Sequence, residues 1–272
     1  MSQSQAPAIR YSRLVNQSPI FYGWVILLMG TLGMIMTSPG QTYAVSIFIE
    51  HFITDLGISR GLVIDPTHEA MLQTIANDEP WTLLEARRTL SFWVLGLGLA
   101  AIAMLSTGLF FHMVSIFTDN GLDAMTAAWV YLPIAVTTAL VNLGSGVLAD
   151  RIPARILLAI ALLLQTTSLF MAQYLQGIEL SFPYGVTLGA TMGLMGTVHG
   201  VGWAKYFGRK YLGSITGTGT AILIVGAALG PMPLGIARDW LGSYNLALTL
   251  GAVIPFSLAI ASLGVGQPHK FG

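Results

Sequence analysis

The placement of the charged residues constrains this chain most. Every Asp, Glu, Lys and Arg falls outside seven long apolar stretches, at about 21–49, 92–118, 126–148, 156–174, 183–204, 214–237 and 244–268. Each stretch is long enough to cross a hydrocarbon core of about 30 Å as a helix rising about 1.5 Å per residue. Continuous apolar character does not fit the alternating pattern of a barrel strand. The sequence therefore predicts an all-α membrane protein, a bundle of about seven transmembrane helices.

Composition agrees with this fold class and excludes several functions. Of the 272 residues, 54% are hydrophobic and only 9% are charged, whereas about a quarter are charged in a typical soluble domain. The net charge of zero gives no electrostatic case for nucleic acid, and the lack of cysteine excludes disulfides and thiolate metal sites. The sequence contains no G-x-S-x-G or H-E-x-x-H motif and no pair of intramembrane aspartates. We expect neither an enzyme nor a metal or other cofactor.

Orientation follows from the Lys and Arg residues in the loops, which concentrate on the cytoplasmic side. For the last six stretches, one side carries Arg60, Arg87, Arg88, Arg151, Arg155, Lys205, Arg209, Lys210 and Lys270, and the other carries only Arg238. This asymmetry predicts that the linker and the C-terminus are cytoplasmic. The N-terminal Arg10 and Arg13 also favour the cytoplasm, and a single span cannot have both ends there. The two signals conflict at "DLGISRGLVIDPTHEA", residues 55–70.

The expected organisation has five parts. A cytoplasmic tail at 1–20 precedes the first transmembrane helix at 21–52, and a polar linker occupies 53–90. Six further helices fill 91–268, and 269–272 form a cytoplasmic tail.

The loop "GSGVLADRIPAR" resembles the G-x-x-x-D-R-x-x-x-R loop of the major facilitator superfamily, with Gly146, Asp150, Arg151 and Arg155 at the matching positions. The alternative interpretation is a charged turn that obeys the positive-inside rule. The family usually has glycine at the position of Pro153 or Ala154, so the match is incomplete.

Further stretches resemble the oxalate–formate antiporter and monocarboxylate carrier group. They are "GWVILLMGTLGMIMTSPGQTYAVSIFIEHFITDLGISR", similar to the first helix, "WTLLEARRTLSFWVL", similar to the approach to the seventh, and "YFGRKYLGSITG", similar to the loop before the eleventh. Those carriers have twelve helices in two halves. The resemblance implies helix one joined to helices seven to twelve, with helices two to six absent and a seam near Arg60.

The resemblance implies a multi-pass protein of the plasma or inner membrane. It would move a small organic solute by alternating access, with a carboxylate as one candidate and a proton or counter-anion as the coupled species. Such a half would act as a homodimer or with a full-length paralogue. The alternative is a non-transporting remnant or accessory protein that associates with a full-length carrier. The carriers of this group hold their substrate carboxylate with a buried Arg or Lys, and the stretches 126–148 and 214–237 contain neither.

Polar side chains inside apolar stretches are candidates for a substrate pathway. They are Gln41, Tyr43, His112, Asn142, His199 and Trp203. Tyr43 fits an interfacial tyrosine equally well, Asn142 shares a helix face with Thr138 and Ser145 that suits helix packing, and both histidines suit either proton transfer or packing. The motif "GAALGPMPLG" places Gly226, Gly230, Pro231 and Gly235 where small residues allow close helix contact and proline weakens the helix.

Overall fold

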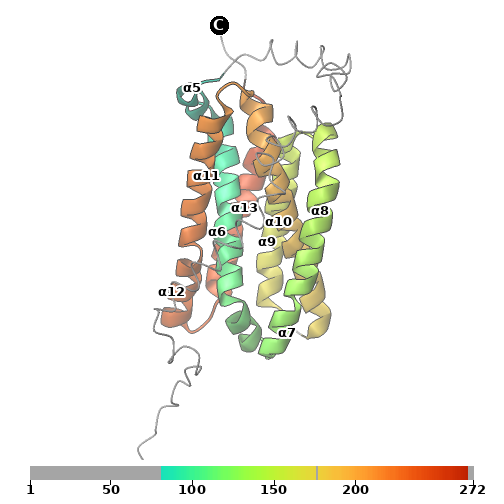
Figure 1. Ribbon diagram of the computed structural model, residues 1–272. Coiled ribbons are helices and arrows are strands. Elements are labelled where there is room, and N and C mark those ends of the chain that lie inside the picture. Colours follow the sequence, from blue (N-terminus) through green and yellow to red (C-terminus); the bar gives the residue numbers. More distant parts are fainter. Residues whose placement is uncertain (1–80, 176, 269–272) are drawn as a thin grey trace, which may run out of the picture. The chain divides into compact units, whose positions relative to one another are not determined.

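The computed structural model describes residues 81–175 and 177–268, which belong to one compact unit, Thr74–Gly272. Its helices are α5 (Leu83–Arg87), α6 (Leu90–Asp119), α7 (Ala124–Trp129), α8 (Tyr131–Arg151), α9 (Ala154–Gln173), α10 (Ile178–Phe207), α11 (Leu212–Leu229), α12 (Pro231–Leu241) and α13 (Asn245–Gly264). No strand occurs within these ranges (Figure 1). The all-α prediction is confirmed for this part of the chain.

Five helical segments are long and apolar enough to cross a membrane. They are α6, α7 joined to α8, α9, α11 joined to α12, and α13. The predicted span at 183–204 forms most of α10, which has 30 residues, but its glycines, threonines and histidine make it less apolar than the other five. The first predicted span, with Gln41 and Tyr43, and the linker up to residue 80 lie outside the described residues. The chain is a membrane protein, and five of the seven predicted spans are supported.

Short polar residues fix where the first helices begin. Thr82 and Glu85 form a reciprocal capping box at α5, and the Thr89 hydroxyl accepts a bond from the Phe92 amide at the start of α6. Asp123 caps α7 by accepting bonds from the hydroxyl of Thr126 at 2.5 Å and its amide at 2.8 Å. These bonds stabilise the carboxylate and hold the pKa of Asp123 below its ordinary value. Such caps satisfy amides that have no partner within the helix.

Two predicted spans are each built from two helices. The stretch 126–148 changes from α7 to α8 at Val130, and the stretch 214–237 changes from α11 to α12 at Gly230 and Pro231. A proline has no amide hydrogen to donate to the preceding turn, so the helix is interrupted there. After α12, Gly242 adopts a φ of 67°, a left-handed conformation that glycine reaches without strain.

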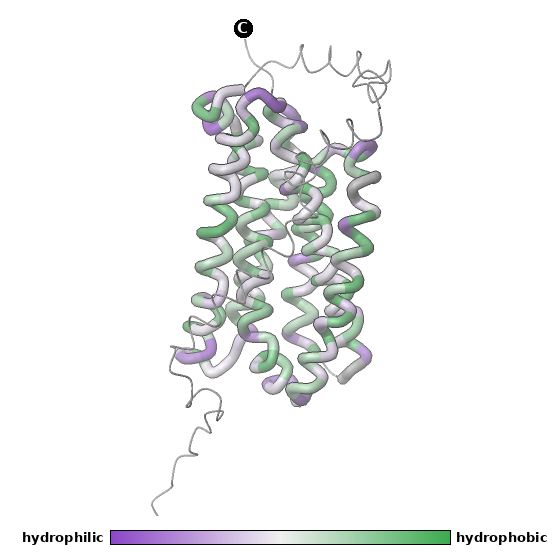
Figure 2. Tube along the Cα trace, viewed as in Figure 1, coloured by the Kyte–Doolittle hydropathy of each residue, from purple (hydrophilic) through white to green (hydrophobic). Residues whose placement is uncertain are grey.

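Successive long helices run in alternating directions, which brings distant charges to the same end of the bundle (Figure 1). Of the eight Lys and Arg residues described, all but Arg238 lie at the end that carries α5 and the α8–α9 and α10–α11 connections. We call this the basic end. The opposite end carries Arg238 with Asp119, Asp123, Glu179 and Asp239. Figure 2 shows hydrophilic residues gathered mainly at the two ends, and this pattern matches a bundle with both ends in water.

The helices pack in defined pairs around two hydrophobic clusters. The most extensive contacts join α10 to α8, α13 to α9, α10 to α9, and α11 to α6. One cluster, toward the basic end, includes Phe92, Leu158 and Trp203, and the other includes Phe117 and Tyr184. Many large apolar side chains on the outer surface are exposed, including Trp240 at 83% and Leu143 at 76%. Exposed apolar surface of this extent fits a surrounding of lipid chains.

Candidate functional site

A row of glycines on α10 brings this helix into backbone contact with α8. A Cβ atom at Gly189 would lie 2.5 Å from the Ile134 carbonyl oxygen, and one at Gly193 would lie 2.9 Å from the Thr138 carbonyl oxygen. The Thr138 hydroxyl donates across this contact to the Gly189 carbonyl oxygen at 3.1 Å. Small residues allow such close approach in membranes. Thr138 therefore serves the packing of α8 against α10.

Toward the basic end, the same interface becomes polar. The Thr197 hydroxyl on α10 lies 3.3 Å from the Asn142 side-chain oxygen and 2.5 Å from the Ser145 hydroxyl, both on α8. Thr197 and Ser145 are buried, whereas Asn142 is exposed. No described residue accepts a hydrogen bond from the Asn142 amide nitrogen, which lies next to Gly196. Asn142 is thus oriented through its oxygen, and its amide group is free to donate outward.

His199 continues this polar region on the other side of α10. Its Nε2 atom lies 3.2 Å from the Thr220 hydroxyl on α11, and both residues are half-buried. Gly196 lies three residues before His199 and Gly200 directly after it, and both glycines are exposed. Nothing lies within 4 Å of a Cβ placed at Gly200. The absence of side chains at these two glycines leaves the imidazole accessible from outside the bundle. We call Asn142, Gly196, His199, Gly200 and Thr220 the polar face.

Trp203 lies one helical turn beyond His199 but points into the bundle interior. It is 1% exposed and contacts the rings of Phe92 and Phe207, with centroid distances of 5.3 and 6.3 Å. A Cβ atom at Gly219 would overlap the indole ring, so α11 reaches Trp203 only because residue 219 is glycine. The indole nitrogen has no hydrogen-bond partner among the described residues. Trp203 therefore supports the helices beneath the polar face and does not line it.

His112 lies far from the polar face. Its Nε2 atom is 3.0 Å from the Pro231 carbonyl oxygen, and its Nδ1 atom is 3.1 Å from the Tyr244 hydroxyl, which also lies 2.9 Å from Ser115. Since a carbonyl oxygen only accepts, Nε2 carries a hydrogen that it donates to Pro231, and the Tyr244 hydroxyl donates its own hydrogen to Ser115. At about 1.5 Å per residue, His112 and His199 are separated by roughly 20 Å along the bundle. The structure does not bring the two histidines together.

His112 instead ties the break between α11 and α12 to α6 and α13. We expect His112→Ala to lower the free energy of unfolding by about 1–3 kcal/mol, because it removes both imidazole hydrogen bonds, those with the Tyr244 hydroxyl and the Pro231 carbonyl oxygen. Thermal unfolding of the purified protein in detergent measures this. Phe111→Ala, at the exposed neighbouring position, is the control and should cost much less. Equal melting temperatures for His112→Ala and the wild type would contradict this role.

The predicted glycine motif lies where α11 and α12 cross α6. A Cβ atom at Gly226 would lie 2.6 Å from the Ala100 carbonyl oxygen, and one at Gly108 would lie 2.7 Å from the Gly230 carbonyl oxygen. Gly235 faces His112, with its Cβ position 3.8 Å from the imidazole. The contacts at Gly226 and Gly230 are with the backbone of α6, which places the motif in helix packing.

The residues that match the major facilitator loop in the sequence "GSGVLADRIPAR" lie at the basic end. Gly146, Asp150 and Arg151 belong to the last turns of α8, and Arg155 belongs to the first turn of α9. The Lys205 ammonium of α10 donates to the Ala149 carbonyl oxygen, which joins the two helix ends. Within the described ranges, no ion pair links Asp150 to a basic residue. An ion pair does form at the opposite end of the bundle, between Arg238 and Asp119 at 2.5 Å.

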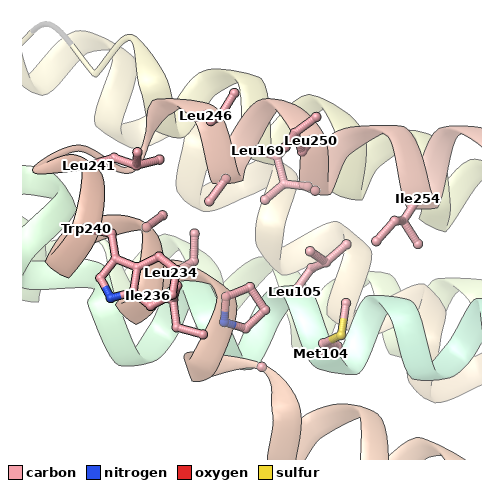
Figure 3. Close-up of a pocket in the computed structure, with 15 residues that line it drawn as sticks. Met104, Leu105, Leu169, Leu234, Ile236, Trp240, Leu241, Leu246, Leu250 and Ile254 are labelled. Carbon is pink, nitrogen blue, oxygen red and sulfur yellow. The ribbon is translucent and has the colours of Figure 1, made fainter.

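A large apolar cavity of about 370 Å³ lies between α6, α9, α12 and α13 (Figure 3). Its lining includes Met104, Leu169, Leu234, Trp240 and Leu250. Side chains of this kind cannot orient a polar solute, which requires a few convergent hydrogen-bonding groups. The polar face has such groups, and we take it as the candidate site. Among the described residues, no group of three or more His, Cys, Asp and Glu could hold a metal ion.

The sequence identified Asn142 and His199 but not their partners. Thr197 and Thr220 were missed, although Thr197 lies two residues before His199 and Thr220 lies in the "TGTGT" run of α11. No protein-family model matches this chain, and no curated protein matches it. The geometry of the site therefore carries the functional argument.

Proposed function

We propose that this chain is a secondary carrier of the facilitator type, which moves a small organic solute across the plasma or inner membrane. The observation that supports this best is the polar face, which presents Asn142 and His199 at a depth where lipid chains would otherwise contact the helices. Polar groups exposed to lipid are unfavourable, so such a face requires a polar partner or solute. The exposed glycines beside His199 leave room for one.

The packing of the helices supports the six-helix half of such a carrier. The described helices divide into two units of three spans, α6 to α9 and α10 to α13, which start from opposite ends of the bundle. If the spans of the two units are matched in order, α6 corresponds to α10, α8 to α11 and α9 to α13. The contact of α6 with α11 then corresponds to that of α10 with α8, and the contact of α9 with α13 corresponds to itself. All three contacts are extensive. Inverted repeats of three helices are nested in each half of facilitator carriers. Rocking of such a half against a second one gives alternating access.

The chemistry of the polar face suggests a solute that is uncharged when bound. None of the seven apolar stretches contains an Asp, Glu, Lys or Arg. A bare carboxylate would lack a counter-charge there, at a cost of several kcal/mol. Donors and acceptors such as the Asn142 amide and the His199 imidazole suit a neutral hydrogen-bonding solute. A carboxylate would enter together with a proton.

The second candidate function is that of an accessory membrane protein without transport activity. The seven predicted spans amount to little more than half of a twelve-helix carrier, and alternating access requires two halves around the site. In this case the polar face packs against a full-length carrier. Co-purification of such a carrier in fixed stoichiometry, together with no flux from the chain alone, would favour this function.

Uptake into proteoliposomes tests the carrier function. We expect flux for at least one solute in a panel that pairs carboxylic acids with their amides, and flux of an acid should fall as the pH rises above its pKa. Asn142→Ala and His199→Ala should each weaken the apparent affinity up to about tenfold, the value of one hydrogen bond. The adjacent, lipid-facing Leu143→Ala is the control. Correctly inserted protein that moves no solute would refute the carrier function.

A further inference from the structure

A second pocket, at the basic end, has a chemistry unlike that of the polar face. Its volume is about 480 Å³, and it lies where α8 ends, α9 begins, α10 ends and the chain continues beyond α13. Its lining side chains include Asp150, Arg151, Arg155, Lys205, Tyr206 and Gln267. Because both α8 and α9 pass from apolar to charged residues here, the pocket lies at the depth where lipid headgroups meet water.

The pocket carries an excess of positive charge that no other described residue neutralises. Three basic side chains face one carboxylate, and within the described ranges Asp150 forms no ion pair with Arg151, Arg155 or Lys205. Lys205 is held at the wall by its bond to the Ala149 carbonyl oxygen. Arg151 is exposed and Arg155 is half-buried, so their guanidinium groups remain available to a ligand.

The backbone around these arginines is fixed by hydrogen bonds. The Ser262 hydroxyl of α13 donates to the Arg155 carbonyl oxygen at 3.1 Å, and the Gln267 amide donates to the Lys205 carbonyl oxygen at 3.0 Å. These bonds hold the start of α9 and the end of α10 beside the segment that follows α13. The charged side chains therefore extend from a defined frame formed by three parts of the chain.

We propose that this pocket binds an anion that bears a phosphate group, supplied either by a lipid headgroup or by a soluble phosphate compound. Guanidinium groups bind phosphate oxygens through two parallel hydrogen bonds, and basic pockets at the cytoplasmic ends of transmembrane helices suit anionic headgroups. The carboxylate of Asp150 would repel a second negative charge on the ligand. The pocket therefore favours a phosphodiester, which carries one negative charge, over a phosphate group that carries two. The site is separate from the polar face, and its occupancy does not depend on transport.

The experiment compares two probes on the purified full chain. Phosphatidylglycerol is added to the protein in detergent, with zwitterionic phosphatidylcholine as the comparison, and the retained lipids are counted by native mass spectrometry. Inorganic phosphate is titrated separately and followed by thermal shift. The pocket variant is Arg151→Gln with Arg155→Gln. The matched control is Arg209→Gln with Lys210→Gln, which removes the same charge from exposed positions at the same end, outside the pocket lining.

We expect preferential retention of phosphatidylglycerol, weakened about fivefold for each pocket arginine removed and unchanged in the control. Raising the salt concentration should weaken it further. An arginine-dependent shift with inorganic phosphate, without a preference for phosphatidylglycerol, would support the site with a soluble ligand. Equal retention in the pocket variant and the control, with no arginine-dependent phosphate shift, would overturn it. If the double glutamine variant unfolds, the lysine pair Arg151→Lys with Arg155→Lys keeps the charge and should bind with intermediate strength.

Discussion

An alanine at Gly189 is expected to destabilise the bundle by about 1–3 kcal/mol or more, although it adds only one methyl group. The added Cβ would lie 2.5 Å from the Ile134 carbonyl oxygen and 3.0 Å from the Thr137 Cβ atom. The first of these is a backbone atom of α8, so no rotamer change relieves the overlap. The helices must separate, and the bond from Thr138 to the Gly189 carbonyl oxygen weakens as they do.

Gly200→Ala is the matched control, because it makes the same substitution on the same helix. Nothing lies within 4 Å of the Cβ position at Gly200, and alanine favours a helix over glycine by up to about 1 kcal/mol. Thermal unfolding in detergent should therefore show a lower midpoint for Gly189→Ala and an equal or higher one for Gly200→Ala. A similar decrease of the unfolding midpoint in both variants would mean that the glycines of α10 provide flexibility and not close approach to α8.

The helical fold could be predicted from the sequence because the lipid bilayer leaves few solutions for long uncharged stretches. The stretch predicted at 92–118 forms α6 at Leu90–Asp119, since charged residues and the Thr89 cap define its ends. Pro231 marks the break between α11 and α12. The break at Val130 has no comparable signal, because Pro133 lies three residues later, in the first turn of α8, where proline is tolerated.

The candidate site was only partly predictable, and the reason is physical. Helical periodicity assigns Asn142 or His112 to a face of its own helix, but it does not say which helix packs against that face. The partners of His112 are Tyr244, 132 residues later in the chain, and Pro231. Only the packing of α6 against α12 and α13 shows that both ring nitrogens of this histidine have partners, whereas His199 has one hydrogen-bond partner among the described residues and exposed glycines beside it.

Trp203→Ala is expected to cost about 3–5 kcal/mol, the typical effect of removing a fully buried aromatic side chain. The indole fills the space between α6, α10 and α11, against Phe92, Phe207 and the bare backbone of Gly219. Trp240→Ala, at a position that is 83% exposed, is the matched control and should change the unfolding midpoint little.

Trp203→Phe separates packing from hydrogen bonding at the same position. Since the Trp203 indole nitrogen has no partner among the described residues, phenylalanine loses no such bond and should retain most of the stability that alanine loses. A phenylalanine variant as unstable as the alanine variant would mean that the indole nitrogen is bonded in the membrane.

The Gly219 backbone of α11 packs on the Trp203 indole, and this contact sets how α11 lies against α10. Loss of the ring should therefore also move Thr220 away from His199. The alanine variant should therefore weaken solute affinity as His199→Ala does, although Trp203 does not line the polar face.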